Sequence, residues 1–267
     1  MIKKILKYFI SDYISYRIRA LKKTWFPSEK EKKRLKQDEE NVKKRKFFYG
    51  AFIEKDDLCF DVGANVGNRI IPLIEIGAKI VAVEPQELCY KILKYKFGER
   101  IRIIKKGIGA KESIEDFYLS DATVMSSFSI DWINGVKAER FKANTWTKIA
   151  KVEMTTLDML IEKYGLPKFI KIDVEGYELN VLKGLTKPID FISFEYTVPE
   201  QTNNAIKCLV QIENNDKNIE CNYSIGESME FVLSEWLSVE KMKECIISKE
   251  FIESGFGDIY VRRQNNF

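Results

Sequence analysis

Short apolar runs rich in β-forming residues alternate with helical segments after residue 57, and this alternation constrains the fold more than any other feature. The runs are LCFDV, KIVAVEP, IRIIKKGI, FIKIDV and IDFISFEY, and the helical patterns cover residues 68–76, 86–96, 155–164 and 177–185. Strands that alternate with helices form mostly parallel sheets with helices on both faces. We therefore expect an α/β fold of the Rossmann-like type.

Further elements follow toward the end of the chain. The segments IECNYSI, MEFVL and DIYVRR are typical of strands, and they surround a helical pattern at residues 239–247. Thr155 and Asp158 predict a capping box at the start of the helix at 155–164, and Gly165 predicts its end. Residues 109–150 interrupt the alternation, so we interpret them as an insertion.

The N-terminus has a different character. Its first 23 residues, MIKKILKYFISDYISYRIRALKK, carry apolar residues at helical spacing with lysines and arginines beside them. Residues 1–46 hold 16 Lys and Arg against 6 Asp and Glu, a net charge of +10, and the rest of the chain carries 28 against 34, or −6. We expect a basic amphipathic helical extension over residues 1–46 and a main domain over residues 47–267.

The charged residues of this extension interrupt every apolar run, which excludes a membrane span and a secretory signal. Two interpretations of residues 1–25 stay open: the helix packs on its own domain, or it lies on an anionic membrane surface. The stretch PSEKEKKRLKQDEENVKKRK that follows predicts a solvated helix.

Residue types narrow the chemistry further. The chain has no histidine, which excludes a Ser-His triad, a histidine base and a histidine-ligated zinc. Its five cysteines are scattered without a C-x-x-C pair, so we expect reduced thiols, as in a cytoplasmic protein, with Cys59 in the core of a strand.

The segment after the first strand is the main candidate for ligand binding. In open α/β sheets, ligands bind beyond the carboxyl ends of the strands, where glycines let the backbone approach them. This place is occupied by Asp61, Gly63, Ala64, Asn65 and Gly67. The segment lacks the G-K-[ST] of a P-loop and the G-x-G-x-x-G of a dinucleotide site.

The carboxylate of Asp61 indicates which ligand fits. A fixed negative charge opposes a pyrophosphate and favours a cation. S-adenosylmethionine is a nucleoside with an ammonium and a sulfonium group and no phosphate. Glu84 ends the second strand about 20 residues later, where an acid commonly binds ribose hydroxyls. The two acids together predict a site for S-adenosylmethionine, whereas the alternative is a helix N-cap at Asp61 and a turn residue at Glu84.

Five segments together resemble the FkbM family of S-adenosylmethionine-dependent methyltransferases. They are FDVGANVG, VAVEP, TTLDMLIEKYGLPKFIKIDVEGYELNVLKGL, ISFEY and GFGDIYVRR, and the resemblance covers roughly residues 57–263. It implies the class I methyltransferase fold and transfer of a methyl group to hydroxyls of sugars, polyketides and related compounds. It also implies that the cofactor is held by Asp61, Gly63, Asn65, Gly67 and Glu84. Asn65 stands where many class I loops have a glycine.

The segment FIKIDVEGYE carries the candidate catalytic residues. Strand alternation places Ile170 and Ile172 on one face and Lys171 and Asp173 on the other. The resemblance implies that Asp173 and Glu175 face the methyl group and the acceptor, and our hypothesis is that one of them is the general base or orients the acceptor hydroxyl. The alternative for Glu175 and Glu178 is that they favour a helix N-terminus.

Other interpretations stay open. A divalent ion held by Asp173, Glu175 and Glu195 is conceivable, although we expect no metal. Aromatic residues of the insertion, together with Trp236, are candidates for a sugar platform or for core, with Ser126, Ser127 and Asp131 as polar anchors. These aromatic residues are Tyr118, Phe128, Trp132, Phe141 and Trp146.

We expect an O-methyltransferase that acts on a sugar, a glycan precursor or a similar small molecule. We place it in the cytoplasm, with a peripheral membrane contact through residues 1–25. A rival function is an RNA methyltransferase that uses the basic N-terminus as an electrostatic arm, but the −6 charge of the main domain disfavours nucleic acid. Another rival is a non-catalytic adaptor with the same fold.

Overall fold

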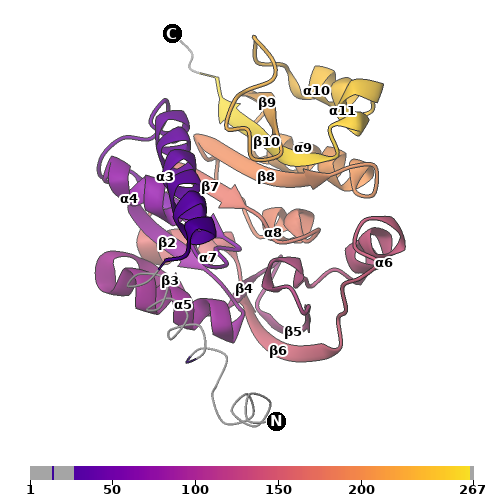
Figure 1. The fold of residues 1–267 in the computed structure, drawn as a ribbon. Coiled ribbons are helices and arrows are strands. Elements are labelled where there is room, and N and C mark those ends of the chain that lie inside the picture. Colours follow the sequence, from indigo (N-terminus) through magenta and orange to yellow (C-terminus); the bar gives the residue numbers. More distant parts are fainter. Residues whose placement is uncertain (1–13, 15–26, 265–267) are drawn as a thin grey trace.

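The computed structural model describes residue 14 and residues 27–264, which are built around a seven-stranded sheet (Figure 1). In chain order its strands are β1 (Leu58–Val62), β2 (Lys79–Val83), β3 (Arg102–Ile104), β7 (Phe169–Ile172), β8 (Phe191–Thr197), β9 (Ile219–Ile225) and β10 (Phe256–Arg263). They lie side by side in the order β3-β2-β1-β7-β8-β10-β9. The first five strands of this order are parallel, and β10 is antiparallel to both β8 and β9.

Helices cover both faces of the sheet. They are α3 (Glu29–Tyr49), α4 (Ile70–Ile76), α5 (Glu87–Phe97), α7 (Leu157–Tyr164), α8 (Glu178–Lys183), α9 (Thr202–Asn215), α10 (Val239–Ile246) and α11 (Lys249–Glu253), with a 3₁₀ turn η1 (Gly98–Arg100) after α5. Apolar residues of α3, α4 and α5 pack on one face, and those of α7 to α11 pack on the other. This confirms the expected α/β fold, with a mostly parallel sheet and helices on both faces.

The alternation expected in the segment FIKIDV is present. Ile170 and Ile172 belong to the core on the α7–α11 face, and Phe169 belongs to the core on the α3–α5 face. Lys171 shares the face of Phe169 and is buried. Cys59 is buried in β1, as expected, and all five thiols are free.

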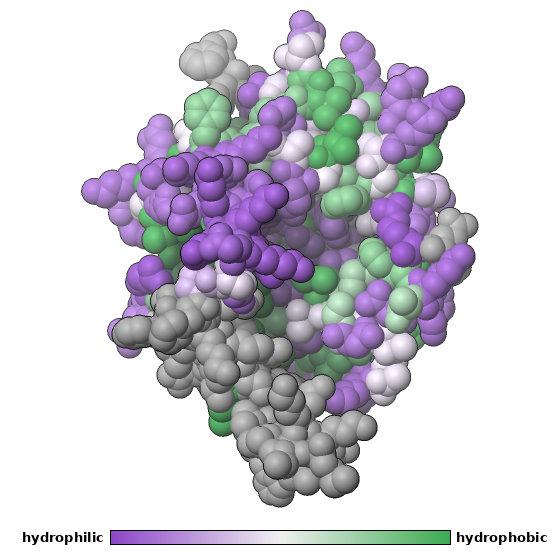
Figure 2. Space-filling model, in the orientation of Figure 1, coloured by the Kyte–Doolittle hydropathy of each residue, from purple (hydrophilic) through white to green (hydrophobic). Residues whose placement is uncertain are grey.

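Helix α3 is the charged stretch before the main sheet. Ser28 and Glu31 form a capping box at its start, and most of its side chains are exposed, which confirms the solvated helix. Its surface is strongly hydrophilic in Figure 2. The helix continues past residue 46, and Phe48 and Tyr49 at its end are part of the core. Apart from Ile14, residues 1–25 lie outside the described part of the chain.

The insertion forms a second, smaller sheet. Its strands β4 (Gly107–Ile108), β5 (Ser113–Leu119) and β6 (Lys148–Thr155) lie in the order β4-β6-β5. A 3₁₀ turn η2 (Thr123–Met125) and helix α6 (Ile130–Glu139) connect β5 to β6. The apolar run IRIIKKGI therefore does not form one strand, because β3 and β4 belong to different sheets.

Two other sequence expectations are wrong in detail. The segment MEFVL forms no strand, because Met229 has a left-handed backbone (φ 51°) and Phe231 turns back to pack on Phe48. Helix α7 is capped by Thr156, whose side chain accepts a hydrogen bond from the amide of Met159, rather than by Thr155. Among the described residues, no helix has the length and apolar character to cross a bilayer.

Candidate active site

One cavity of about 240 Å³ lies beyond the carboxyl ends of the parallel strands. Asp61, Glu84, Asp173 and Glu175 all line it, although they come from three different strands and the loops after them. Parallel strands bring their carboxyl ends to the same side of a sheet, and this explains why residues more than 100 positions apart meet here.

The loop after β1 depends on backbone conformations that few residues adopt. Gly63 has φ 85°, and a Cβ atom at this position would lie 1.8 Å from the carbonyl oxygen of Asp173. Asn65 has φ 45°, a left-handed conformation that asparagine tolerates better than most residues. The amides of Gly63 and Ala64 both donate to the carbonyl of Val83, which fixes the loop against β2. All three residues line the cavity.

Gly67 has a different position. It is absent from the residues that line the cavity, and a Cβ atom there would lie 2.4 Å from the ring of Phe97. Its φ of 82° and the close ring are by themselves sufficient reason for a glycine at this position.

Asp61 offers a carboxylate that lacks a partner. It is buried, and its Oδ2 atom has no hydrogen-bond partner among the described residues. Burial raises the pKa of Asp61 to about 6, against the lowering effect of Lys171. A buried carboxylate oxygen in a cavity wall calls for a donor or a cation, and the ammonium of S-adenosylmethionine supplies both.

Glu84 is buried and held in a fixed orientation. Its carboxylate accepts hydrogen bonds from the amide of Asn65 (2.8 Å) and the amide of Gln86 (2.7 Å). Burial raises the pKa of Glu84 to about 7, and these two bonds work against that rise. A carboxylate oxygen accepts more than one hydrogen bond, so Glu84 keeps capacity for the ribose hydroxyls of the predicted cofactor.

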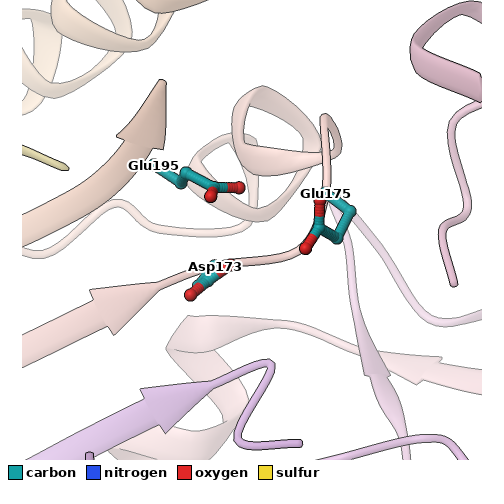
Figure 3. A group of neighbouring side chains, drawn as sticks. All are labelled: Asp173, Glu175 and Glu195. Atoms are coloured by element: carbon teal, nitrogen blue, oxygen red, sulfur yellow. The ribbon is translucent and has the colours of Figure 1, made fainter. Parts of the chain in front are cut away.

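Three carboxylates meet at the ends of β7 and β8. Oxygen atoms of Asp173, Glu175 and Glu195 lie within 4.8 Å of one another, and the three side chains come from the end of β7, the loop after it and β8 (Figure 3). Burial, followed by the charge of Asp173, raises the pKa of Glu175 and of Glu195 well above the ordinary range.

Lys171 lies directly below this cluster and is fully buried. Its Nζ atom is 2.7 Å from Oδ2 of Asp173 and 3.8 Å from Oδ1 of Asp258. Although burial opposes the charged form, the ammonium holds the pKa of Asp173 below its ordinary value. Asp173 is therefore ionised under conditions in which Glu175 and Glu195 carry protons.

The loop that carries Glu175 is held from two sides. Glu175 and Gly176 have φ values of 54° and 83°. The hydroxyl of Ser127 donates to the carbonyl of Glu175 at 2.6 Å, and Trp132 packs so closely that a Cβ atom on Gly176 would lie 2.4 Å from it. From the other side, the buried carboxylate of Glu178 accepts from the amides of Val174 and Gly176. Glu178 therefore fixes the loop backbone.

The insertion supplies one wall of the cavity. Phe128 and Ser126 line it, whereas Ser127 holds the loop behind it. The other aromatic candidates are not among the lining residues. Trp132 is buried, and Trp236 packs in the core on the α3–α5 face. The indole N–H of Trp146 donates a hydrogen bond to the carbonyl of Met125. Asp131 is exposed on α6. Tyr118 and Phe141 pack with Trp132 in the small core of the insertion.

Among the lining residues that were missed from the sequence, three are joined by ion pairs. They are Arg45 in α3, Arg69 before α4 and Glu227 after β9. Arg45 and Glu227 lie outside the loops that follow the parallel strands, whereas Arg69 lies in the loop after β1, two residues beyond Gly67, and no motif marks any of the three.

Comparison with solved structures gives distant matches. A precorrin-6y C5,15-methyltransferase from Geobacter metallireducens is 9% identical, with 82% of this chain and 86% of that chain covered at a TM-score of 0.44. SMU.1697c, a putative methyltransferase from Streptococcus mutans in complex with SAH, is 10% identical, with 84% and 98% covered at a TM-score of 0.44.

Comparison by sequence gives a relative and a family. The hexuronic acid methyltransferase AglP of Haloferax volcanii is 27% identical over 144 residues, which are 53% of this chain and 55% of the relative, so the chain spans about half of that protein's length. The methyltransferase FkbM domain matches residues 61–235, from Asp61 in the cavity to the segment beyond Glu227. This match covers more than half of the chain, which therefore belongs to the FkbM family of S-adenosylmethionine-dependent methyltransferases.

Proposed function

We propose that this protein transfers a methyl group to a hydroxyl oxygen of a sugar or a glycan precursor. The observation that carries the proposal is the cluster of Asp173, Glu175 and Glu195 in the wall of the cavity that also holds Asp61 and Glu84. A hydroxyl acceptor must be oriented and must lose its proton, and carboxylates do both in a chain without histidine. The similarity to a hexuronic acid methyltransferase supports a sugar as the acceptor.

The cofactor is proposed to lie along the ends of β2, β1 and β7. Glu84 would bind the ribose hydroxyls, Asp61 would bind the ammonium group, and the backbone of Gly63, Ala64 and Asn65 would pass close to the ligand. When bound, S-adenosylmethionine supplies the methyl group on a positively charged sulfur. We leave Gly67 out of the contacts with the cofactor, because it faces Phe97.

Asp173 and Glu175 are proposed to divide the work at the acceptor. Lys171 keeps Asp173 ionised, so Asp173 is suited to accept a hydrogen bond and orient the hydroxyl. Glu175 has a raised pKa and therefore binds a proton more firmly than an ordinary carboxylate. A general base needs this property, so Glu175 in its ionised form is the group that takes the hydroxyl proton.

The experiment is methyl transfer from labelled S-adenosylmethionine to a panel of sugars and lipid-linked glycans. Glu175→Gln is expected to reduce turnover by about 100-fold, which is within the range of general acid-base catalysis, while calorimetry shows unchanged binding of S-adenosylhomocysteine. Glu162→Gln, on an exposed turn of α7, is the matched control. Unchanged turnover in both Glu175→Gln and Asp173→Asn would remove the assigned roles.

A metal-dependent reaction is the main alternative, because hard cations take oxygen ligands and the three carboxylates of the cluster lie within reach of one ion. We propose that the cluster works without a metal, since the ammonium of Lys171 already contacts Asp173. Strong chelators are then expected to leave turnover unchanged. Loss of turnover with EDTA and its recovery with Mg²⁺ or Mn²⁺ would support the alternative.

The basic N-terminus is proposed to hold the protein at the cytoplasmic face of a membrane that carries lipid-linked acceptors. Liposome flotation of the full chain and of a chain without residues 1–25 tests this idea. The idea fails if neither form binds to liposomes, or if both forms bind equally well. Strongly salt-sensitive binding of RNA would instead favour RNA as the acceptor. Failure to bind S-adenosylhomocysteine would favour a non-catalytic adaptor.

A further inference from the structure

The acidic residues that line the cavity are arranged in the order of the strands in the sheet. Glu84 follows β2, Asp61 ends β1, Asp173 follows β7, Glu195 lies in β8 and Glu227 follows β9. The residues assigned to the cofactor occupy the β2 and β1 side of the carboxylate cluster. The β8 and β9 side of the same cavity is therefore left for the acceptor.

Two arginines of the cavity wall reach this second side: both contact Glu227 after β9, although Arg69 itself belongs to the loop after β1. Arg45 comes from the last turns of α3 and Arg69 from the residue before α4, and their side chains are only 14% and 11% exposed. The Oε2 atom of Glu227 lies 3.2 Å from Nη2 of Arg45 and 2.6 Å from Nη1 of Arg69. A single carboxylate oxygen thus bridges two nearly buried guanidinium groups in the cavity wall.

Glu227 is more exposed than the arginines that it bridges. Its side chain is 56% exposed, and it lies in the turn after β9, between Gly226 at φ 51° and Met229 at φ 51°. Arg69 has a second carboxylate nearby, since its Nη2 lies 3.8 Å from Oδ2 of the buried Asp258. For Arg45, Glu227 is the only carboxylate paired with it in the described part of the chain. Displacing Glu227 would therefore leave Arg45 able to bind another carboxylate.

We propose that Arg45 and Arg69 bind a carboxylate of the acceptor, and that Glu227 occupies this place until the acceptor arrives. The acceptor would then be an acidic sugar, a hexuronic acid residue, with its hydroxyls directed toward Asp173 and Glu175. Arginine suits this role because its planar fork matches the two oxygens of a carboxylate. The inference rests on the proposed function and adds the substrate class and the residues that select it.

The test compares two acceptors that differ in one group, the methyl glycosides of glucuronic acid and of glucose. For the wild-type protein, kcat/KM is expected to be at least about tenfold higher for the glucuronide, because hydrogen bonds between charged groups are roughly twice as strong as neutral ones. Arg45→Gln is expected to abolish this preference with unchanged binding of S-adenosylhomocysteine. Arg45→Lys should restore it only in part, since lysine lacks the planar fork.

The substitution Glu227→Gln gives the sharpest result, because the two roles of Glu227 predict opposite signs. If Glu227 occupies the carboxylate site, removing its charge lowers KM for the glucuronide and leaves KM for the glucoside unchanged. If Glu227 only supports the fold, Glu227→Gln weakens both acceptors. Glu230→Gln is the matched control, since Glu230 lies in the same segment, pairs with Lys44 and does not line the cavity.

The remaining outcomes are distinct. Equal kcat/KM for both glycosides would overturn the inference and leave the proposed function intact. A higher kcat/KM for the glucoside 6-phosphate than for the glucuronide would have the same meaning. Methyl transfer to neither glycoside, with no calorimetric binding of the glucuronide to the complex with S-adenosylhomocysteine, would overturn both. A lower KM for the glucuronide in Glu227→Gln, absent in Glu230→Gln, supports the inference.

Discussion

The Nζ atom of Lys171 lies 2.7 Å from the Oδ2 atom of Asp173, and both residues belong to the same segment at the end of β7. The lysine is fully buried, and Asp258 and Arg69 complete a network of charges beneath the cavity. Burying charges costs free energy, which is recovered only when each charge has partners. This network therefore links the stability of the fold to the ionisation of a proposed active-site residue.

Lys171→Met is expected to destabilise the protein by about 3–5 kcal/mol, because it leaves Asp173 and Asp258 with less compensation in a buried site. Chemical denaturation measures the loss. Lys168→Met, three residues earlier on the same segment, removes an ion pair with Asp190 whose side chains are 36% and 47% exposed. It should cost less than about 1 kcal/mol. Equal losses in the two variants would contradict the role given to the buried network.

Gly63→Ala is expected to abolish binding of S-adenosylhomocysteine and to destabilise the fold by about 3 kcal/mol or more. The new Cβ atom would lie 1.8 Å from a backbone oxygen of Asp173, and the φ of 85° is strained for alanine. Gly98→Ala is the matched control, because its φ is 56° but its Cβ would meet open space. It should cost about 1–3 kcal/mol, from backbone strain alone, and leave calorimetric binding unchanged.

Glu178→Gln is expected to gain stability relative to the wild type as the pH rises. Burial raises the pKa of Glu178 from 4.5 to about 7 in the folded state, despite its backbone hydrogen bonds. The folded protein therefore holds this proton more firmly, and the stabilisation is lost as the pH rises from 4.5 through 7. Glutamine has no proton to lose. The difference in unfolding free energy should move by about 1–3 kcal/mol in favour of the variant between pH 4.5 and pH 8. A difference that stays constant across this range would contradict the prediction.

Ser127→Ala is expected to lower kcat and to leave the affinity for S-adenosylhomocysteine unchanged. Its hydroxyl donates to the carbonyl of Glu175 and accepts from the amide of Ser129 at 2.8 Å. Losing both bonds should cost about 1–3 kcal/mol of stability and release the backbone of Glu175 from its left-handed conformation. Steady-state kinetics and calorimetry separate the two effects. Ser120→Ala, at the end of the same hairpin and outside the cavity, should alter neither quantity.

Much of the parallel sheet could be predicted from the sequence, because buried parallel strands are continuous apolar runs. LCFDV became β1 with the expected bounds. Outside the parallel part of the sheet, IECNYSI became β9, which is antiparallel to β10. Failures came where tertiary contacts outweigh local pattern. MEFVL has an apolar composition, but Met229 and Phe231 pack with the core on the α3–α5 face, and the hydrogen bond from the amide of Val232 to the carbonyl of Tyr223 does not extend into a strand. Helix α9 was missed because its polar residues conceal the apolar stripe of Ala205, Cys208, Leu209 and Ile212.

Some residues of the candidate active site could likewise be predicted from the sequence, and others could not. Asp61, Glu84, Asp173 and Glu175 could be located from the sequence, because each follows a recognisable strand at the side of the sheet where ligands bind. Arg45 and Glu227 could not, since one lies in a charged helix full of similar residues and the other in a turn without a motif. For Gly67 the sequence offers two reasons that it cannot separate, because the glycine lies in the predicted binding loop and also packs against the ring of Phe97.

Strand β10 lies between β8 and β9, although it follows both in the chain. During synthesis on the ribosome, β9 has no place to dock until residues 256–263 have emerged, so the two strands must be added together. Asp258 arrives with them and is the counter-ion that Lys171 and Arg69 share. A nascent chain that stops before β10 would therefore leave Lys171 with Asp173 and Arg69 with Glu227 but without the buried carboxylate between them, and the β8 and β9 side of the cavity would be the last part of the protein to mature.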